Sequence, residues 1–86
     1  MAFYLYDPKP NVNQVYHVDS NKNEYFGEAP RGTATSESRW RIFAIIYATP
    51  GDQTSSWQIH YPNGSDLPSF EWDEVESFTY ALLAAR

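Results

Sequence analysis

The residues of this chain that could do chemistry include two histidines, His17 and His60. Two imidazoles and a carboxylate can together hold a zinc ion. Neither histidine lies at the helical i, i+4 spacing that would place two ligands on one face. Both fall in segments that we expect to be strands, at outward positions. The pattern therefore predicts exposed histidines rather than a metal site.

An acidic cluster near the C-terminal end is the second candidate. Two carboxylates held across a cleft can hydrolyse a glycosidic bond. Strand alternation would place Glu71 and Asp73 together, opposite Trp72, which is the arrangement of an ordinary solvent-facing surface. A weak calcium site is the other interpretation, because hard oxygen ligands need only proximity. The cluster comprises Asp66, Glu71, Asp73, Glu74 and Glu76.

A third pattern, Asp19-x-Asn21-x-Asn23, begins like a calcium-binding loop. That loop requires a glycine at its sixth position and a carboxylate at its twelfth, where this chain has Glu24 and Pro30. The residues therefore predict a turn held by Asx side chains. With no Ser-His-Asp set, phosphate loop or nucleophile elbow, we expect no enzyme and no cofactor.

Size and charge restrict the classes of function further. The chain has 86 residues, no cysteine and a net charge of −5, so we expect one domain without disulfides or thiolate metal sites. Six scattered Lys and Arg argue against binding to nucleic acid or to anionic membranes. The segment Met1–Tyr6 does not resemble a signal peptide, which predicts synthesis in a host cytoplasm.

The positions of the three tryptophans indicate strands. Trp40, Trp57 and Trp72 each begin or end an alternating segment, as in Trp40-Arg41-Ile42. A cysteine-free domain this small needs large aromatic side chains in its core or at a subunit interface. We therefore expect these tryptophans to be buried with Ile42 and Ile59. The rival interpretation is that they form an exposed platform for sugars.

The element pattern predicts an all-β fold, a small antiparallel β-sandwich or barrel-like sheet of about five to seven short strands with at most one or two short helical turns. Residues 42–47 are apolar on both faces, which implies burial on both sides or an interface on one. A helix over 37–46 is the competing interpretation of that region. We expect a hairpin over 14–29, strands over 39–48, 56–61 and 68–72, a helical turn over 73–77, and a last strand or short helix over 78–83.

The first residues form an aromatic segment followed by two prolines. We expect residues 1–12 to be an extended arm and residues 13–86 a single β domain. Pro8 and Pro10 favour an extended linker, and an exposed apolar segment of this kind usually marks an interface. The alternative is a first strand on the chain's own sheet. The predicted partner-binding residues are Phe3, Tyr4, Leu5, Tyr6, Phe43, Ile45 and Tyr47.

A longer string of motifs, covering roughly residues 25–81, resembles a known family. It runs from Phe26-Gly27-Glu28-Ala29-Pro30 and Gly32-Thr33-Ala34-Thr35-Ser36 through Trp40-Arg41-Ile42 and Asn63-Gly64-Ser65 to Phe70-x-Trp72-Asp73 and Ser77-Phe78-Thr79-Tyr80. This string is similar to that of small β-rich virion structural proteins of tailed bacteriophages. It departs from the family pattern after Trp72-Asp73, where acidic residues replace an expected basic one.

The resemblance implies a non-enzymatic role in a particle, as a head decoration or cement protein or in the neck, tail or fibre region. The expected partners are major capsid, tail or fibre proteins and further copies of this chain, within the virion. The alternative is a small carbohydrate-binding β module that uses exposed aromatics. A weaker third hypothesis is an intracellular enzyme inhibitor or regulator.

Overall fold

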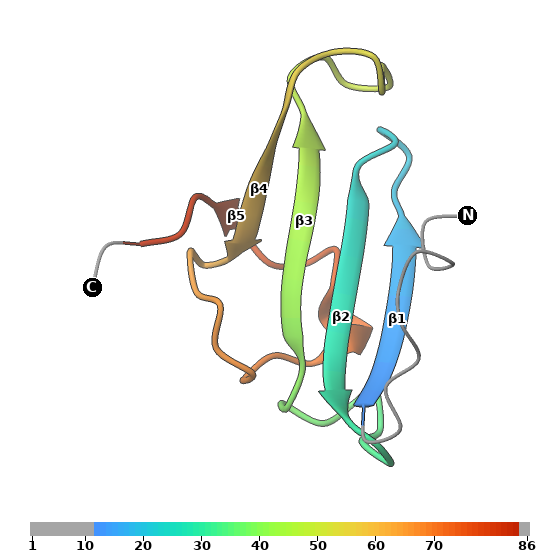
Figure 1. Ribbon diagram of the computed structural model, residues 1–86, viewed down its shortest axis with the longest axis vertical. Helices are drawn as coiled ribbons and strands as arrows, with labels where there is room; N and C mark the ends of the chain where they lie inside the picture. Colours follow the sequence, from blue (N-terminus) through green and yellow to red (C-terminus); the bar gives the residue numbers. More distant parts are fainter. Residues whose placement is uncertain (1–11, 85–86) are drawn as a thin grey trace.

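The computed structural model describes residues 12–84, which form one antiparallel sheet of five strands (Figure 1). The strands lie in the sheet in their order along the chain. The all-β class is confirmed, and the finer expectation of a sandwich or barrel stays a prediction. The elements are β1 (Val12–Val18), β2 (Glu24–Pro30), β3 (Arg41–Tyr47), β4 (Trp57–Pro62), the 3-10 turn η2 (Trp72–Glu74) and β5 (Tyr80–Ala81).

The hairpin of β1 and β2 is confirmed, and its turn is held by one carboxylate. Asp19 accepts hydrogen bonds from the backbone N–H groups of Asn21 at 2.8 Å and Asn23 at 3.0 Å. It also accepts one from Tyr25 Oη at 2.7 Å. Burial opposes the ionisation of Asp19, but these hydrogen bonds outweigh it and hold the pKa of the carboxyl below its usual value. The predicted Asx turn is therefore correct.

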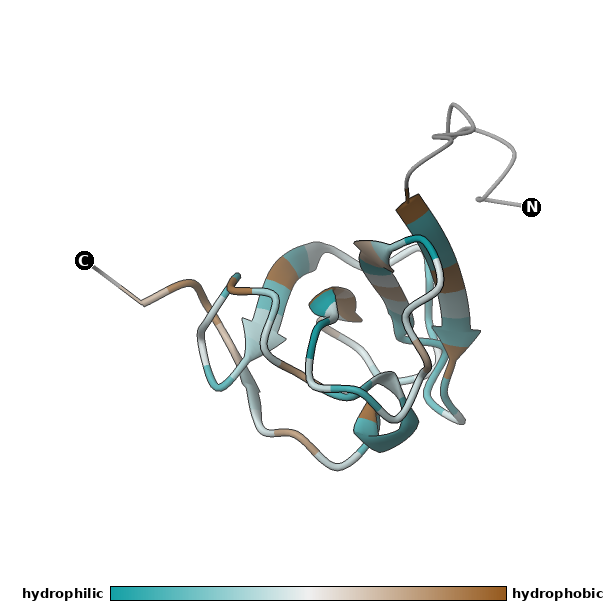
Figure 2. Ribbon diagram, turned by 90° about the horizontal axis from the view of Figure 1, so that it is seen from below, coloured by the Kyte–Doolittle hydropathy of each residue, from teal (hydrophilic) through white to brown (hydrophobic). Residues whose placement is uncertain are grey.

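The inner face of the sheet carries the core. Register places Tyr25, Gly27 and Ala29 of β2 on the same face as Ile42 and Ala44 of β3. All five of these residues are buried. In Figure 2 the apolar positions of β1 appear as separate bands, and of its three valines only Val15, opposite Gly27, lies on the inner face. The core is closed by partly or fully buried residues of the segment after β4: Phe70, Trp72, Val75, Phe78 and Tyr80.

A short backbone bridge attaches that covering segment to the sheet. Trp40 and Phe70 exchange two backbone hydrogen bonds, of 2.9 and 3.2 Å. Trp40 is 1% exposed, and its indole N–H donates to the carbonyl of Ala34 at 2.9 Å. In Figure 1 the segment then runs behind the sheet to η2.

The predicted strand over 68–72 is wrong. Its pairing is limited to the Trp40–Phe70 bridge, after which the chain enters η2 and buries Val75. The 3-10 turn brings Val75 to the core, whereas an extended chain would carry this residue past the sheet. Asp73 therefore lies in the 3-10 turn and Glu71 is its extended N-cap residue, so the two do not share a strand face.

The prediction that Trp57 and Ile59 belong to the core is also wrong. Trp57 is 55% and Ile59 40% exposed, because both point from β4 toward the side of the sheet opposite the covering segment. Trp40 and Ile42 are in the core as predicted. Trp72 is half-buried, with its rings 6.3 Å from those of Trp40.

Gly27 provides the space that lets Trp72 lie on the sheet. A Cβ at this position would come 2.6 Å from Trp72 Cε3 and 2.8 Å from Val15 Cγ2. Both distances are far below a van der Waals contact, so a side chain here would force the covering segment away from the sheet.

We expect Trp40→Ala to lower the free energy of unfolding by about 3–5 kcal/mol, because it leaves a large cavity in the core. Trp57→Ala serves as the matched variant and should cost less than about 1 kcal/mol, because its side chain is largely in water. Urea unfolding of both proteins measures the two values. Equal losses of stability would show that Trp57 is a core residue after all.

Gly27→Ala should destabilise the fold by about 1–3 kcal/mol through overpacking against Trp72 and Val15. In a Trp72→Leu background the same change should cost less, because the ring atoms that the Cβ meets are gone. Thermal unfolding of the four proteins of this double-mutant cycle tests the contact. Strict additivity would rule it out.

Candidate functional site

The outer face of the sheet is the most prominent surface of the described chain. Strand register places the outward side chains of β1 to β4 in rows that cross the sheet. Most of these side chains are aromatic or branched aliphatic, and the segment that closes the core packs on the opposite side. We define the outer face by Tyr16, Val18, Phe26, Phe43, Ile45, Tyr47, Trp57, Ile59 and Tyr61.

An aromatic row runs across the middle of the outer face. Tyr16, Phe26 and Phe43 are direct neighbours in register on β1, β2 and β3. The rings of Phe26 and Phe43 are stacked, with centroids 4.9 Å apart and 14° between their planes. Those of Tyr16 and Phe26 lie 5.1 Å apart. Such cross-strand pairs stabilise a sheet and keep the rings at fixed positions.

Glu24 is a charged residue within the outer face, and two phenols pair with it. Tyr16 Oη donates to Glu24 Oε1 at 2.9 Å, and Tyr47 Oη donates to Oε2. The hydrogen bond to Glu24, together with burial and the negative charge nearby, raises the pKa of Tyr47 to about 12. The carboxylate therefore orients two aromatic side chains.

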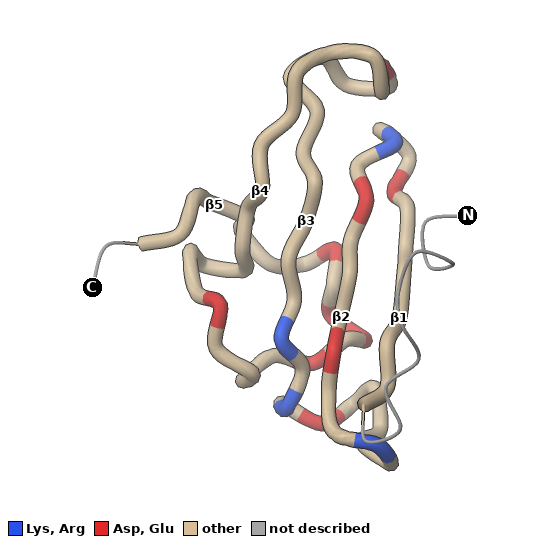
Figure 3. The backbone as a smooth tube through the Cα atoms, viewed as in Figure 1, with Lys and Arg blue, Asp and Glu red and all other residues tan. Residues whose placement is uncertain are grey.

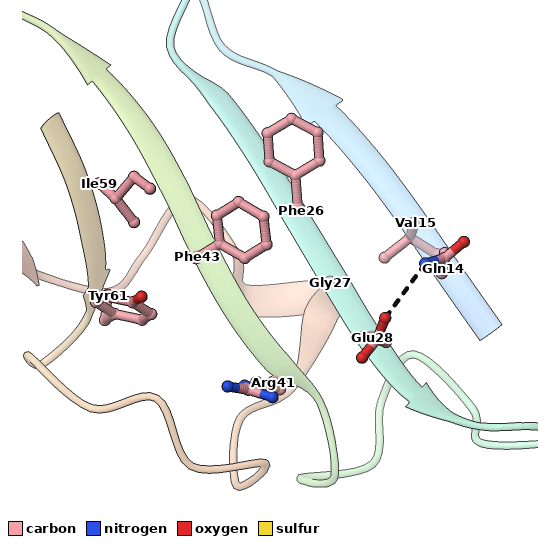
Figure 4. A pocket seen from close by; sticks show the side chains of 9 residues that line it. All are labelled: Gln14, Val15, Phe26, Gly27, Glu28, Arg41, Phe43, Ile59 and Tyr61. Atoms are coloured by element: carbon pink, nitrogen blue, oxygen red, sulfur yellow. Dashed lines mark hydrogen bonds between the residues drawn. The ribbon is translucent and has the colours of Figure 1, made fainter. Parts of the chain in front are cut away.

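A hollow of about 310 Å³ lies on the lower half of the outer face (Figure 4). One end is a polar row, Gln14, Glu28 and Arg41, which are neighbours in register. Gln14 Nε2 donates to Glu28 Oε2 at 3.2 Å. The other end is apolar and is lined by the side chains of Phe26, Phe43, Ile59 and Tyr61.

The charges of the outer face are few and of both signs. Figure 3 shows acidic positions along β2 and a basic position at the start of β3. The sequences of these strands identify them as Glu24, Glu28 and Arg41. Arg41 stands directly opposite Glu28 in register. The polar end of the hollow therefore offers a guanidinium, a carboxylate and an amide, next to aromatic rings.

Three predicted partner-binding residues, Phe43, Ile45 and Tyr47, lie together on the outer face of β3 and are half-buried. The opposite residues of β3, Ile42 and Ala44, are in the core. This arrangement explains why the strand is apolar on both faces. Four further predicted residues lie outside the described part of the chain: Phe3, Tyr4, Leu5 and Tyr6.

Sequence reasoning missed other members of the outer face, including Tyr16, Phe26 and Trp57. The available signal was the alternation of Trp57, Ile59 and Tyr61, which correctly put these three on one face. Of these three, Trp57 and Ile59 were expected in the core, because a small domain needs large side chains there.

The expected outward position of the histidines is wrong, although the hydrogen bonds that both form are exposed to solvent. His17 and His60 belong to the register row of Tyr25 and Ala44, on the inner side of the sheet. His17 Nε2 hydrogen-bonds to Glu76 Oε2, and His60 Nε2 forms a 3.1 Å hydrogen bond with Gln58 Oε1. Within residues 12–84, no group of three or more His, Cys, Asp or Glu is arranged to hold a metal ion.

A comparison with protein-family models, curated proteins and solved structures finds no match to this chain. None of the described elements is a helix with the length and apolarity that crossing a membrane requires. The outer face is therefore the feature of the described chain that points to a function.

The pairing of Tyr47 with Glu24 predicts a change of stability at high pH. The pKa of Tyr47 is raised to about 12, whereas an unfolded tyrosine ionises near pH 10. The hydrogen bond therefore stabilises the fold fully below pH ~10, and its contribution is lost as the pH rises through about 12.

Ultraviolet titration of tyrosinate, taken as the difference between the wild type and Tyr47→Phe, isolates this group. We expect ionisation near pH 12 in the wild type and close to pH 10 in Glu24→Gln, where the acceptor is neutral. An unchanged titration in Glu24→Gln would contradict the assigned pairing.

Proposed function

We propose that this chain is a non-enzymatic structural component of a tailed-phage virion, and that it binds other virion proteins through the outer face of its sheet. The observation that carries the proposal is the exposed aromatic and aliphatic surface around Trp57 and Ile59. Head decoration and a place in the neck, tail or fibre region both fit this role. The same surface can join copies of the chain within a particle.

The exposure of Trp57 supports a protein partner. An indole that is 55% exposed next to a 40% exposed isoleucine is unfavourable in water. Aromatic side chains on rigid elements lose little conformational entropy on binding, and tryptophan is enriched at the energetic centres of interfaces. Tyr47, directly opposite Trp57 in register, extends the apolar surface onto β3.

The motif resemblance supports the location in a phage particle. Its residues have structural positions that suit a stable building block. Trp40 and Phe70 form the bridge that attaches the covering segment, and Gly27 provides the space for Trp72. Asn63-Gly64 forms the turn after β4, with both residues at positive φ. These motifs therefore belong to the scaffold, and the outer face supplies the binding surface.

A carbohydrate-binding module is the second candidate, and the pair of Trp57 and Tyr47 favours it. The two residues are neighbours in register near the ends of their strands, and exposed aromatic rings of this kind provide stacking surfaces for sugar rings. Under this function, soluble oligosaccharides from the bacterial cell surface would shift the fluorescence of Trp57. Under the first function they would not.

Mass spectrometry of particles from the phage that encodes this chain tests the location. The binding surface is tested by complementing a deletion of the gene with variants. Trp57→Ala should reduce incorporation into particles by about tenfold or more, because loss of a central aromatic anchor costs about 2 kcal/mol or more of binding energy.

Leu82→Ala is the matched control, because Leu82 is 57% exposed but lies beyond β5 and away from the outer face. It should be incorporated like the wild type. Equal incorporation of Trp57→Ala and the wild type, or a chain that is missing from purified particles, would refute the proposal.

A further inference from the structure

We propose that the free edge of β4 pairs with the same edge of a second copy of this chain, so that the sheets of the two copies continue into one. The free edge consists of Trp57, Gln58 and Ile59, at the start of β4. This inference goes beyond the proposed function, because it concerns the backbone edge rather than the outer face and applies to the isolated protein without a particle.

The strand β5 leaves this part of β4 unpaired. It is the neighbour of β4 on that side of the sheet, and its register covers Tyr61 and Pro62 alone. After β5 the chain stays beside the turn that follows β4, where the N–H of Ala84 donates to the carbonyl of Gly64 at 2.9 Å. In Figure 1 the chain after β5 leads away from the sheet, and within residues 12–84 no element pairs with this side of the upper part of β4.

The hydrogen bonds to β3 show which backbone groups point to the free edge. The N–H of Ala48 donates to the carbonyl of Ser56 at 2.8 Å, so the backbone groups of Ser56 are directed toward β3. In an antiparallel strand this direction alternates from one residue to the next. The backbone groups of Gln58 therefore also pair with β3, whereas those of Trp57 and Ile59 point to the opposite side.

The hydrogen bonds to β5 agree with this assignment. The N–H of Asn63 donates to the carbonyl of Thr79 at 2.7 Å, and Asn63 is an even number of residues from both Trp57 and Ile59. An edge of this kind is a template for a further strand, which proteins usually block with a lysine, a proline or a bulge. Residues 56–60 contain no lysine or proline, and their register with β3 has no bulge. The free edge is therefore open to pairing.

The free edge is complementary to itself. A two-fold axis beside Gln58 places Trp57 of each copy opposite Ile59 of the other, and each such pair can exchange two hydrogen bonds. An axis beside Ile59 would use the edge groups of Tyr61, which pair with β5. An axis beside Trp57 would bring in Ser55, which precedes the strand. The axis beside Gln58 alone satisfies the edge groups of both residues.

The side chains also suit a second copy of the chain. Trp57 packs beside Ile59 of the other copy, and pairs of an aromatic and a β-branched residue stabilise neighbouring strands. The two Gln58 side chains meet on the opposite side of the sheet, where their amides can hydrogen-bond to each other. Residues 56–60 contain no Asp, Glu, Lys or Arg, so the pairing places no like charges together although the chain carries a net charge of −5.

This pairing keeps the outer face open. Its hydrogen bonds lie in the plane of the sheet, whereas the side chains of Trp57 and Ile59 stand roughly perpendicular to that plane. Both side chains therefore still face solvent or a further partner. The outer faces of the two copies become one continuous surface.

The variant Ile59→Pro tests the backbone hydrogen bonds. It removes an N–H that points to the free edge and leaves the pairing with β3 intact, as proline does on edge strands. Ile59→Ala is the matched control, because it also loses the side chain but keeps the N–H. In sedimentation equilibrium up to millimolar concentration, the wild type should dimerise. Ile59→Pro should dimerise at least about tenfold more weakly than Ile59→Ala, because each copy loses a hydrogen bond. A monomeric wild type, or equal association of the two variants, would overturn the proposal.

A second experiment tests the two-fold axis and does not depend on Ile59. Gln58→Glu and Gln58→Lys each place like charges opposite each other, so each variant alone should dimerise about fivefold more weakly than the wild type. An equimolar mixture of the two should recover the association, as heterodimers. The same two substitutions at Leu82, which is exposed but lies beyond β5, control for net charge and should show no such difference. Equal association of the single Gln58 variants and their mixture would overturn the proposal.

Discussion

The structure depends on how one sheet with two apolar faces is covered. The segment between β4 and β5 packs on the inner face, and three contacts hold it there: the Trp40–Phe70 bridge, Trp72 over Gly27, and Val75 in the core. Because the segment enters through a backbone bridge at the lower end of β3, it closes one side of the sheet only. The outer face keeps its aromatic surface.

The outer face is ordered even where no described element covers it. The row of Tyr16, Phe26 and Phe43 packs sideways across three strands. Glu24 holds the phenols of Tyr16 and Tyr47 at fixed positions. A surface whose side chains are already fixed loses less entropy when a partner binds. This is the physical reason to interpret the outer face as an interface.

Much of the architecture could be predicted from local patterns. The turn at Asp19 to Asn23 and the strands that became β1 to β4 follow from polar turn residues and from alternation. Alternation also placed Phe43, Ile45 and Tyr47 on one face. It says which residues share a face, but it does not say which face will be covered.

Coverage depends on the segment after β4, and its structure could not be read from alternation. Phe70-Glu71-Trp72 has the pattern of a strand, yet after one bridge the chain forms η2 and buries Val75. The burial of Val75 against residues that are distant in the sequence outweighs the local strand pattern of this segment. Trp57 was consequently assigned to the wrong side. The role in a virion stays a prediction from motif resemblance.

Hydroxyl-radical footprinting, with oxidation read by mass spectrometry, tests the central claim most directly, namely that the outer face is an interface. The isolated protein is compared with the protein in purified phage particles. The account predicts that Trp57 and Ile59 are oxidised readily in the isolated chain and are protected in the particle, while Leu82 reacts equally in both. Equal oxidation of Trp57 in the two states would contradict it.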